Sequence, residues 1–148
     1  MIRFITYLTI TFLGIAISFA QVKTEEITVH NQLIELPGTL SFTEVNTPLI
    51  IWIHGSGPVN RNGNQPNYIK QFRDSINKEQ IAFFSFDKRT ANKKNKDYLK
   101  NIKFNDFVED INKVINHFKN DNRFSQIVLA GHSQGSLVAM LALKNVDK

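Results

Sequence analysis

A chain of 148 residues is long enough for one domain with a buried core. Its composition, 42% hydrophobic and 21% charged, is that of a globular protein and excludes a disordered or fibrous chain. The net charge of +5 is mild, and the seven basic residues crowded into residues 88–103 lack the aromatic pattern of a nucleic-acid module. We therefore predict that this segment is a solvated loop and that the protein binds no nucleic acid.

The first twenty residues have the pattern of a secretory signal peptide. Arg3 is their only charge, residues 4–19 form an apolar run broken only by Thr, Gly and Ser, and Ser18 and Ala20 are small residues at the cleavage-site positions. The run is shorter than the roughly 18 residues of a membrane anchor. We expect cleavage after Ala20, a mature domain of residues 21–148 without a membrane anchor, and a secreted or periplasmic location.

An antiparallel β edge is predicted at the beginning of the mature chain. Residues 24–29, 33–36 and 39–42 are short segments rich in branched side chains. Pro37 and Gly38 stand between the last two segments and are typical of a turn. We therefore expect the chain to reverse at these two residues.

The rest of the chain alternates between strands and helices. Continuous apolar runs predict buried strands, and helical spacing of apolar residues predicts the segments between them; the strands are residues 49–53, 81–86 and 127–130, and the helices are residues 68–78, 107–118 and those after residue 133. In the first helix, Tyr68, Phe72 and Ile76 are the expected apolar side. In the second, Asp106 is the expected N-cap, with Glu109 three residues later. The β-α-β-α-β-α order predicts parallel strands with helices on both faces, an α/β fold.

Gly131, His132, Ser133, Gln134 and Gly135 form a G-x-S-x-G motif between the last predicted strand and the last predicted helix. This context is typical of a nucleophile elbow, a tight turn that projects the serine hydroxyl to where a base can reach it. The two glycines are needed because Cβ atoms at their positions would collide with the sheet or the helix. Ser133 is therefore the predicted catalytic nucleophile.

With this elbow, the chain resembles the α/β-hydrolase family. Residues 54–58, His-Gly-Ser-Gly-Pro, are similar to the family's oxyanion loop, and residues 87–89, Asp-Lys-Arg, are similar to the D-x-R of many bacterial esterase and peptidase-like members. The three motifs stand in the family's order over roughly residues 27–148. The resemblance implies a mostly parallel α/β-hydrolase sheet, in which the loops at residues 54 and 131 face one crevice where the strand order reverses.

The resemblance also implies an oxyanion hole made of two backbone N–H groups. One belongs to Gln134, next to the nucleophile, and the other to Ser56, with Gly57 as the alternative. These groups would bind the negative oxygen of a tetrahedral intermediate. The choice concerns main-chain atoms, so it assigns no role to the Ser56 side chain.

The chain departs from the family where the catalytic triad should be completed. In most members an acid and a histidine follow the elbow at some distance. Here 15 residues follow Ser133, among which Asp147 is the sole acid and no histidine occurs. We interpret the chain as a domain truncated after the elbow helix, inactive by itself; the alternative is a natural short protein that completes its sheet with a partner chain. The four histidines are expected to have other roles. His54 makes a structural hydrogen bond in the oxyanion motif, and His132 fills a variable position of the elbow. His117 lies on a solvated helix surface, and His30 lies in the β edge.

Two classes of function remain open. The first is an exported serine hydrolase that cleaves carboxylic esters through an acyl-enzyme at Ser133, with peptide-bond hydrolysis as the alternative within this class. The second is a noncatalytic binding or interaction module that retains the half-sheet. No metal or cofactor is expected, since the histidines lack ligand spacing and the glycine-rich loop lacks a phosphate-binding pattern. The expected partner is a small ester or peptide-like substrate, and the unpaired edge at residues 127–129 predicts self-association.

Overall fold

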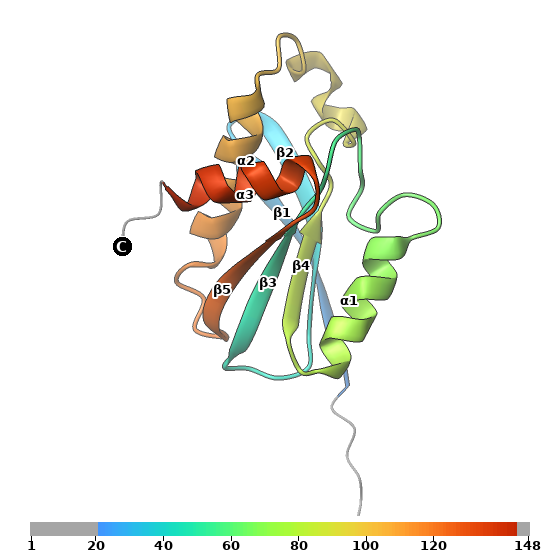
Figure 1. Cartoon of the computed structure of the whole chain (residues 1–148), viewed down its shortest axis with the longest axis vertical. Helices are drawn as coiled ribbons and strands as arrows, with labels where there is room; N and C mark the ends of the chain where they lie inside the picture. The colour runs from blue at the N-terminus through green and yellow to red at the C-terminus, as the bar shows by residue number, and fades with distance from the viewer. Residues whose placement is uncertain (1–20, 145–148) are drawn as a thin grey trace, which may run out of the picture.

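The computed structural model describes residues 21–144. The predicted signal peptide and Asp147 lie outside them. A five-stranded mixed sheet is flanked by helices (Figure 1). The elements in chain order are β1 (Lys23–Asn31), β2 (Ile34–Phe42), β3 (Thr47–Ile53), α1 (Tyr68–Lys78), β4 (Ala82–Phe86), the 3-10 helix η1 (Lys93–Tyr98), α2 (Phe104–Phe118), β5 (Phe124–Gly131) and α3 (Gln134–Leu143).

The strand order is β1-β2-β4-β3-β5. β3 runs parallel to both β4 and β5, and β2 pairs antiparallel with β1 and β4. The predicted α/β class is confirmed. β3 lies between the strands that lead to Asp87 and to Gly131. Within residues 21–144, β5 pairs only with β3, so the elbow strand is an edge of this part of the sheet, as predicted.

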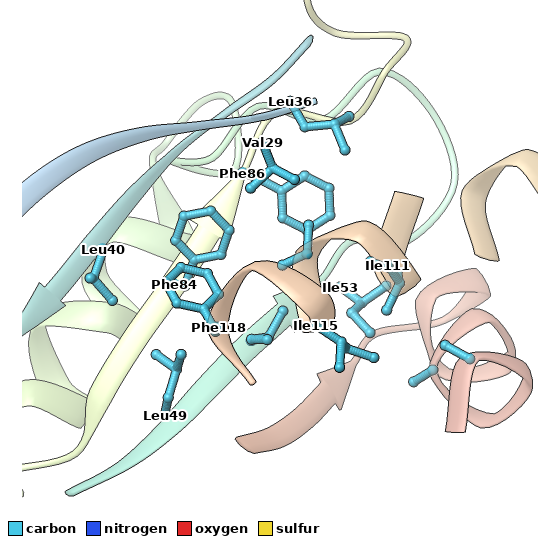
Figure 2. Packing of buried hydrophobic residues seen from close by; sticks show 14 of the residues in the cluster. Val29, Leu36, Leu40, Leu49, Ile53, Phe84, Phe86, Ile111, Ile115 and Phe118 are labelled. Atoms are coloured by element: carbon cyan, nitrogen blue, oxygen red, sulfur yellow. The ribbon is translucent and has the colours of Figure 1, made fainter. Parts of the chain in front are cut away.

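The two faces of the sheet are covered unequally. α1 lies on one face, and α2 and α3 lie on the other (Figure 1). Side chains alternate along a strand, so Leu49, Ile51 and Ile53 of β3 are buried under α2 and α3, while Ile50 and Trp52 are half-buried on the α1 face. Figure 2 shows the core on the α2 side, where the ring of Phe84 meets the ring of Phe118 with centroids 4.8 Å apart.

The predicted turn at Pro37 and Gly38 is wrong. Both residues lie inside β2, where Gly38 stands opposite Ile27 of β1 and Phe86 of β4. A Cβ at Gly38 would overlap the ring of Phe84, so this glycine allows close packing rather than a turn. The chain reverses earlier, between β1 and β2, where Gln32 has a φ of 56°.

Helix α1 has the predicted bounds but a different buried side. Its buried residues are Ile69, Arg73 and Asn77, whereas Tyr68 and Phe72 are exposed. Asn77 can be buried because its amide donates to the carbonyl oxygens of Ser41 and Ile81, at 3.2 and 2.9 Å. Phe72 nevertheless packs on Trp52 and Phe83 of the sheet, with ring centroids 5.3 and 5.8 Å apart, so hydrophobic spacing located the helix and part of its sheet-facing side.

Helix α2 begins earlier than predicted, at Phe104, with Lys103 as its N-cap residue. Asp106 is not the cap but the third residue of the helix. Its carboxylate accepts a hydrogen bond of 2.8 Å from the backbone N–H of Lys103. An acid in the first turn satisfies an end group of the helix from inside it, so the same side chain stabilises a start three residues upstream.

Candidate active site

Ser133 lies in a sharp turn between β5 and α3. Its backbone has φ 53° and ψ −121°, values that a residue with a side chain rarely adopts. Such a conformation costs on the order of 1–3 kcal/mol and persists only where the surroundings enforce it. Here Gly135 N–H donates to the carbonyl of His132, and Ser136 N–H donates to that of Ser133, both at 2.9 Å. The Ser133 residue is exposed, so its hydroxyl is accessible.

Both glycines of the motif stand where no side chain fits. A Cβ at Gly131 would lie 2.5 Å from the carbonyl oxygen of Gly135. A Cβ at Gly135 would overlap the carbonyl oxygen of Ile53 and lie 2.7 Å from that of His54. The collisions predicted from the sequence are therefore present, one within the elbow and one between α3 and the end of β3.

The loop after β3 lies beside the elbow. The backbone N–H of His132 donates to the carbonyl of Ile53 at 3.1 Å, and a Cβ at Gly55 would lie 3.0 Å from Nδ1 of His132. Ser56 is exposed in this loop, and Gly57 has a φ of 88°. The structure thus brings the loop that carries Ser56 next to the turn that carries Ser133 and Gln134.

His54 is buried and makes the expected structural hydrogen bond. Its Nε2–H donates to the carbonyl of Phe86 at 2.7 Å, which joins the ends of β3 and β4. Burial lowers the pKa of His54 from 6.5 to about 4, and the nearby positive charge of Lys88 acts in the same direction. Among the residues that the structure describes, none forms a hydrogen bond with the buried Nδ1 atom.

Of the other histidines, two lie away from the nucleophile and the third lies in the elbow turn beside it. His30 is exposed on β1, four strands from β5, a separation of roughly 19 Å at the usual strand spacing. His117 is exposed at the end of α2, near the beginning of β5, whereas Ser133 follows the end of that strand. His132 is exposed and stacks on Trp52, with ring centroids 6.5 Å apart.

Lys88 and Arg89 correct the prediction of a solvated basic loop. Both are buried, at 7% and 6% exposure, whereas Lys93, Lys94 and Lys96 are exposed around η1. The Lys88 ammonium donates to the carbonyl oxygen of Gly55 at 2.6 Å and to Oε1 of Gln134 at 3.1 Å, and it lies 4.7 Å from the centroid of the Phe107 ring. Burial lowers the pKa of Lys88. Lys88 is the second residue after the buried strand β4, a position that does not by itself distinguish a buried lysine from an exposed one.

Arg89 anchors the same segment to α2. Its guanidinium donates two hydrogen bonds of 2.8 Å to the buried carboxylate of Asp110, and a third of 2.9 Å to the carbonyl of Asp106. The Asn31 amide also donates to Asp110, at 2.8 Å. This two-pronged ion pair satisfies both buried charges and fixes the chain after β4. Sequence reasoning did not identify this network. Asp110 lies on the apolar side of its helix, and this unusual position for an acid was the signal that could have pointed to a buried ion pair.

Residues 21–144 contain no cluster of three or more His, Asp or Glu residues suited to a metal ion. In the same part of the chain, no helix combines the length and apolar character needed to cross a membrane. What the structure does bring together is a strained serine, a glycine-rich loop and a buried lysine at the carboxyl ends of parallel strands. Ligand sites of α/β sheets occupy this edge.

The fold and the elbow define the α/β-hydrolase class. Within it, the chain belongs to the family described as serine aminopeptidase, S33, whose model matches residues 49–148. No curated protein matches the sequence.

Solved structures share the fold at low identity. Est1E from Butyrivibrio proteoclasticus is 23% identical, with 79% of this chain and 44% of that chain covered and a TM-score of 0.62. Dienelactone hydrolase from Anabaena variabilis is 18% identical, with 82% and 57% covered and a TM-score of 0.66. An esterase from Pyrococcus furiosus is 22% identical, with 86% and 48% covered and a TM-score of 0.64. The chain thus spans about half the length of these proteins.

Proposed function

We propose that the protein is an exported serine hydrolase that cleaves carboxylic esters through an acyl-enzyme at Ser133. The observation that carries the proposal is the strained, exposed Ser133 held between two glycines that tolerate no side chain. A turn of this kind costs stability and is useful for presenting a nucleophile. The ester preference is supported by the solved structures, which include an esterase and Est1E with ferulic acid bound.

In the proposed mechanism, the Ser133 hydroxyl attacks the acyl carbon and gives its proton to a histidine. The negative oxygen that develops accepts hydrogen bonds from the backbone N–H groups of Gln134 and Ser56. The alcohol leaves with a proton from the histidine, and water then cleaves the acyl-enzyme. The histidine and its carboxylate partner are proposed to come from residues beyond this sequence, because the described histidines are placed elsewhere or serve the turn.

The decisive experiment is covalent labelling of the complete protein with a fluorophosphonate probe. We expect the probe to modify Ser133, and Ser133→Ala to abolish both labelling and hydrolysis of a short-chain ester. Ser125→Ala is the matched control, because Ser125 is an exposed serine near the beginning of β5, the strand that precedes the elbow. Undiminished ester turnover by the Ser133→Ala variant would refute the serine mechanism.

Peptide-bond hydrolysis is the alternative, and the description of the matched family favours it. It uses the same nucleophile and the same oxyanion donors, so labelling does not distinguish the two. Relative kcat/KM for a p-nitrophenyl ester and an aminoacyl p-nitroanilide does. A preference for the anilide, after correction for intrinsic reactivity, would assign the protein to the peptidases.

A noncatalytic module is a second candidate, favoured by the placement of the described histidines. Its expected result in the same assay is a folded protein whose Ser133 reacts with the probe no faster than Ser125. The strain at Ser133 argues against it, because a binding module gains nothing from that conformation.

A further inference from the structure

Lys88 is a buried ammonium that contacts both loops of the candidate active site. Its Nζ atom reaches the carbonyl oxygen of Gly55 in the loop after β3 and the side-chain oxygen of Gln134 in the elbow, at 2.6 and 3.1 Å. These two residues adjoin or carry the proposed oxyanion donors. The contacts therefore connect the two halves of the proposed oxyanion hole through one side chain.

The bond to Gly55 acts on the Ser56 N–H through the geometry of the peptide unit. The carbonyl of residue 55 and the N–H of residue 56 belong to the same planar group, and in a trans peptide they point in opposite directions. A donor that fixes the carbonyl on one side fixes the N–H on the other. The restraint matters because Gly55 and Gly57 flank this serine, and glycine backbone is otherwise permissive.

The bond to Gln134 acts on the second donor. Gln134 is the first residue of α3, where backbone N–H groups have no earlier helical turn to bond. Its side chain is tied to the same ammonium that holds Gly55. One group thereby sets the spacing between the loop and the start of the helix.

The charge of Lys88 is also available to the site. Among the residues that the structure describes, no carboxylate accepts a hydrogen bond from its ammonium: Asp110 is bound by Arg89 and Asn31, and Asp87 accepts from the backbone of Arg61. The ammonium is stabilised by two neutral oxygens and the face of the Phe107 ring. A buried cation without a paired anion favours negative charge that develops nearby.

We infer that Lys88 is a positioning residue for the oxyanion hole: it orients the Gly55–Ser56 peptide, holds Gln134 beside it and adds positive potential. The kinetic part of this inference rests on the proposed function. The structural part, the orientation of the Ser56 N–H, does not.

The kinetic test uses the complete protein and three variants. Lys88→Met keeps the chain length and removes the charge and the donors, Lys88→Arg keeps both, and Lys93→Met is the control at an exposed lysine. Loss of one oxyanion donor typically costs 10²–10³-fold in kcat, and a misdirected donor should cost part of this. We expect Lys88→Met to lower kcat about 10- to 100-fold with little change in KM, Lys88→Arg to recover part of the loss, and Lys93→Met to match the wild type. A wild-type kcat for Lys88→Met would overturn the inference.

The structural test is an NMR comparison of backbone amides, which needs no activity. In Lys88→Met the amide resonances of Ser56 and Gln134 should shift and their hydrogen exchange should accelerate, whereas Lys93→Met should leave both unchanged. If the wild-type Ser133 fails to react with fluorophosphonate but these amides shift, the hydrolase proposal fails and the orienting role stands. If Ser133 reacts and the Ser56 amide does not move, the role of Lys88 is refuted.

A second variant covers the case in which Lys88→Met does not fold. Gln134→Met replaces the side-chain amide, including the oxygen that lies 3.1 Å from the ammonium, and keeps the backbone N–H. We expect a loss in kcat of about threefold to tenfold, smaller than for Lys88→Met because the bond to Gly55 remains. A wild-type kcat in that variant would overturn the inference.

Discussion

The protonation state of His54 predicts how the protein responds to acid. Its Nε2–H donates to the carbonyl of Phe86, so the neutral ring carries its proton on that nitrogen. Protonation would add an N–H at Nδ1, which is buried and has no acceptor among the described residues. His54→Gln is the informative change, because its amide can donate to Phe86 but cannot become charged.

The lowered pKa of His54 determines the direction in which stability changes with pH. Between about pH 4 and pH 6.5 the unfolded chain takes up a proton at residue 54 that the folded chain refuses. This contribution to stability is therefore fully present above pH 6.5 and is lost as the pH falls towards 4. The difference between a pKa of 6.5 and one of about 4, at 1.36 kcal/mol per pKa unit, corresponds to about 3 kcal/mol.

The assay is urea unfolding of the complete protein at pH 7.5 and pH 4.5, for the wild type and for His54→Gln. Carboxylates titrate in both proteins, so the difference between their losses isolates residue 54. We expect the wild type to lose about 2–3 kcal/mol more than the variant over this interval. Equal losses, with equal slopes against urea, would show that His54 ionises normally in the folded protein.

Four further experiments test the packing, the buried ion pair, the fate of the N-terminus and the sheet edge. Gly135→Ala should destabilise the protein by more than about 3 kcal/mol or prevent folding, because its Cβ would overlap the Ile53 carbonyl, and thermal unfolding will show this. Asp110→Asn should cost about 3–5 kcal/mol in urea unfolding, since it removes the buried carboxylate that Arg89 pairs with and leaves only that of Asp106, 3.6 Å from the guanidinium. N-terminal sequencing of the protein isolated from its own cells should begin at Gln21, and a sequence that begins at residue 1 would contradict the predicted cleavage. Residues 21–148 expressed alone should show little hydrolysis and should associate through β5 in size-exclusion chromatography with light scattering, and a monodisperse monomer would contradict this.

The elements that were predicted correctly are those whose signal is local. A continuous apolar run indicates a strand buried on both faces, as in β3 and β4, and helical spacing indicates a helix buried on one side, as in α2. Both patterns can be recognised from residues that are close together in the sequence. The tight turn at the G-x-S-x-G motif was predictable for the same reason. The residues that form its turn, and the glycines that permit it, are consecutive in the chain.

The errors arose where a residue's role depends on distant partners. Gly38 looks like a turn residue until the ring of Phe84, from a strand far along the chain, is placed against it. Lys88 and Arg89 look like members of a basic loop, and only the folded chain supplies the Gly55 carbonyl and the Asp110 carboxylate that allow their burial. A polar residue that follows a buried strand has no local mark that separates an exposed side chain from a satisfied buried one.

The three motifs form one hydrogen-bonded unit at the carboxyl ends of β4, β3 and β5. His54 bonds to Phe86, Lys88 bonds to Gly55, and His132 N–H bonds to the carbonyl of Ile53, so each strand end is tied to a neighbour in the sheet. The strain at Ser133 needs such surroundings, because an isolated turn would relax to an ordinary conformation. The geometry of the proposed nucleophile site therefore depends on the buried polar groups behind it, above all on the Lys88 ammonium and the His54 imidazole, which form no hydrogen bond with the serine.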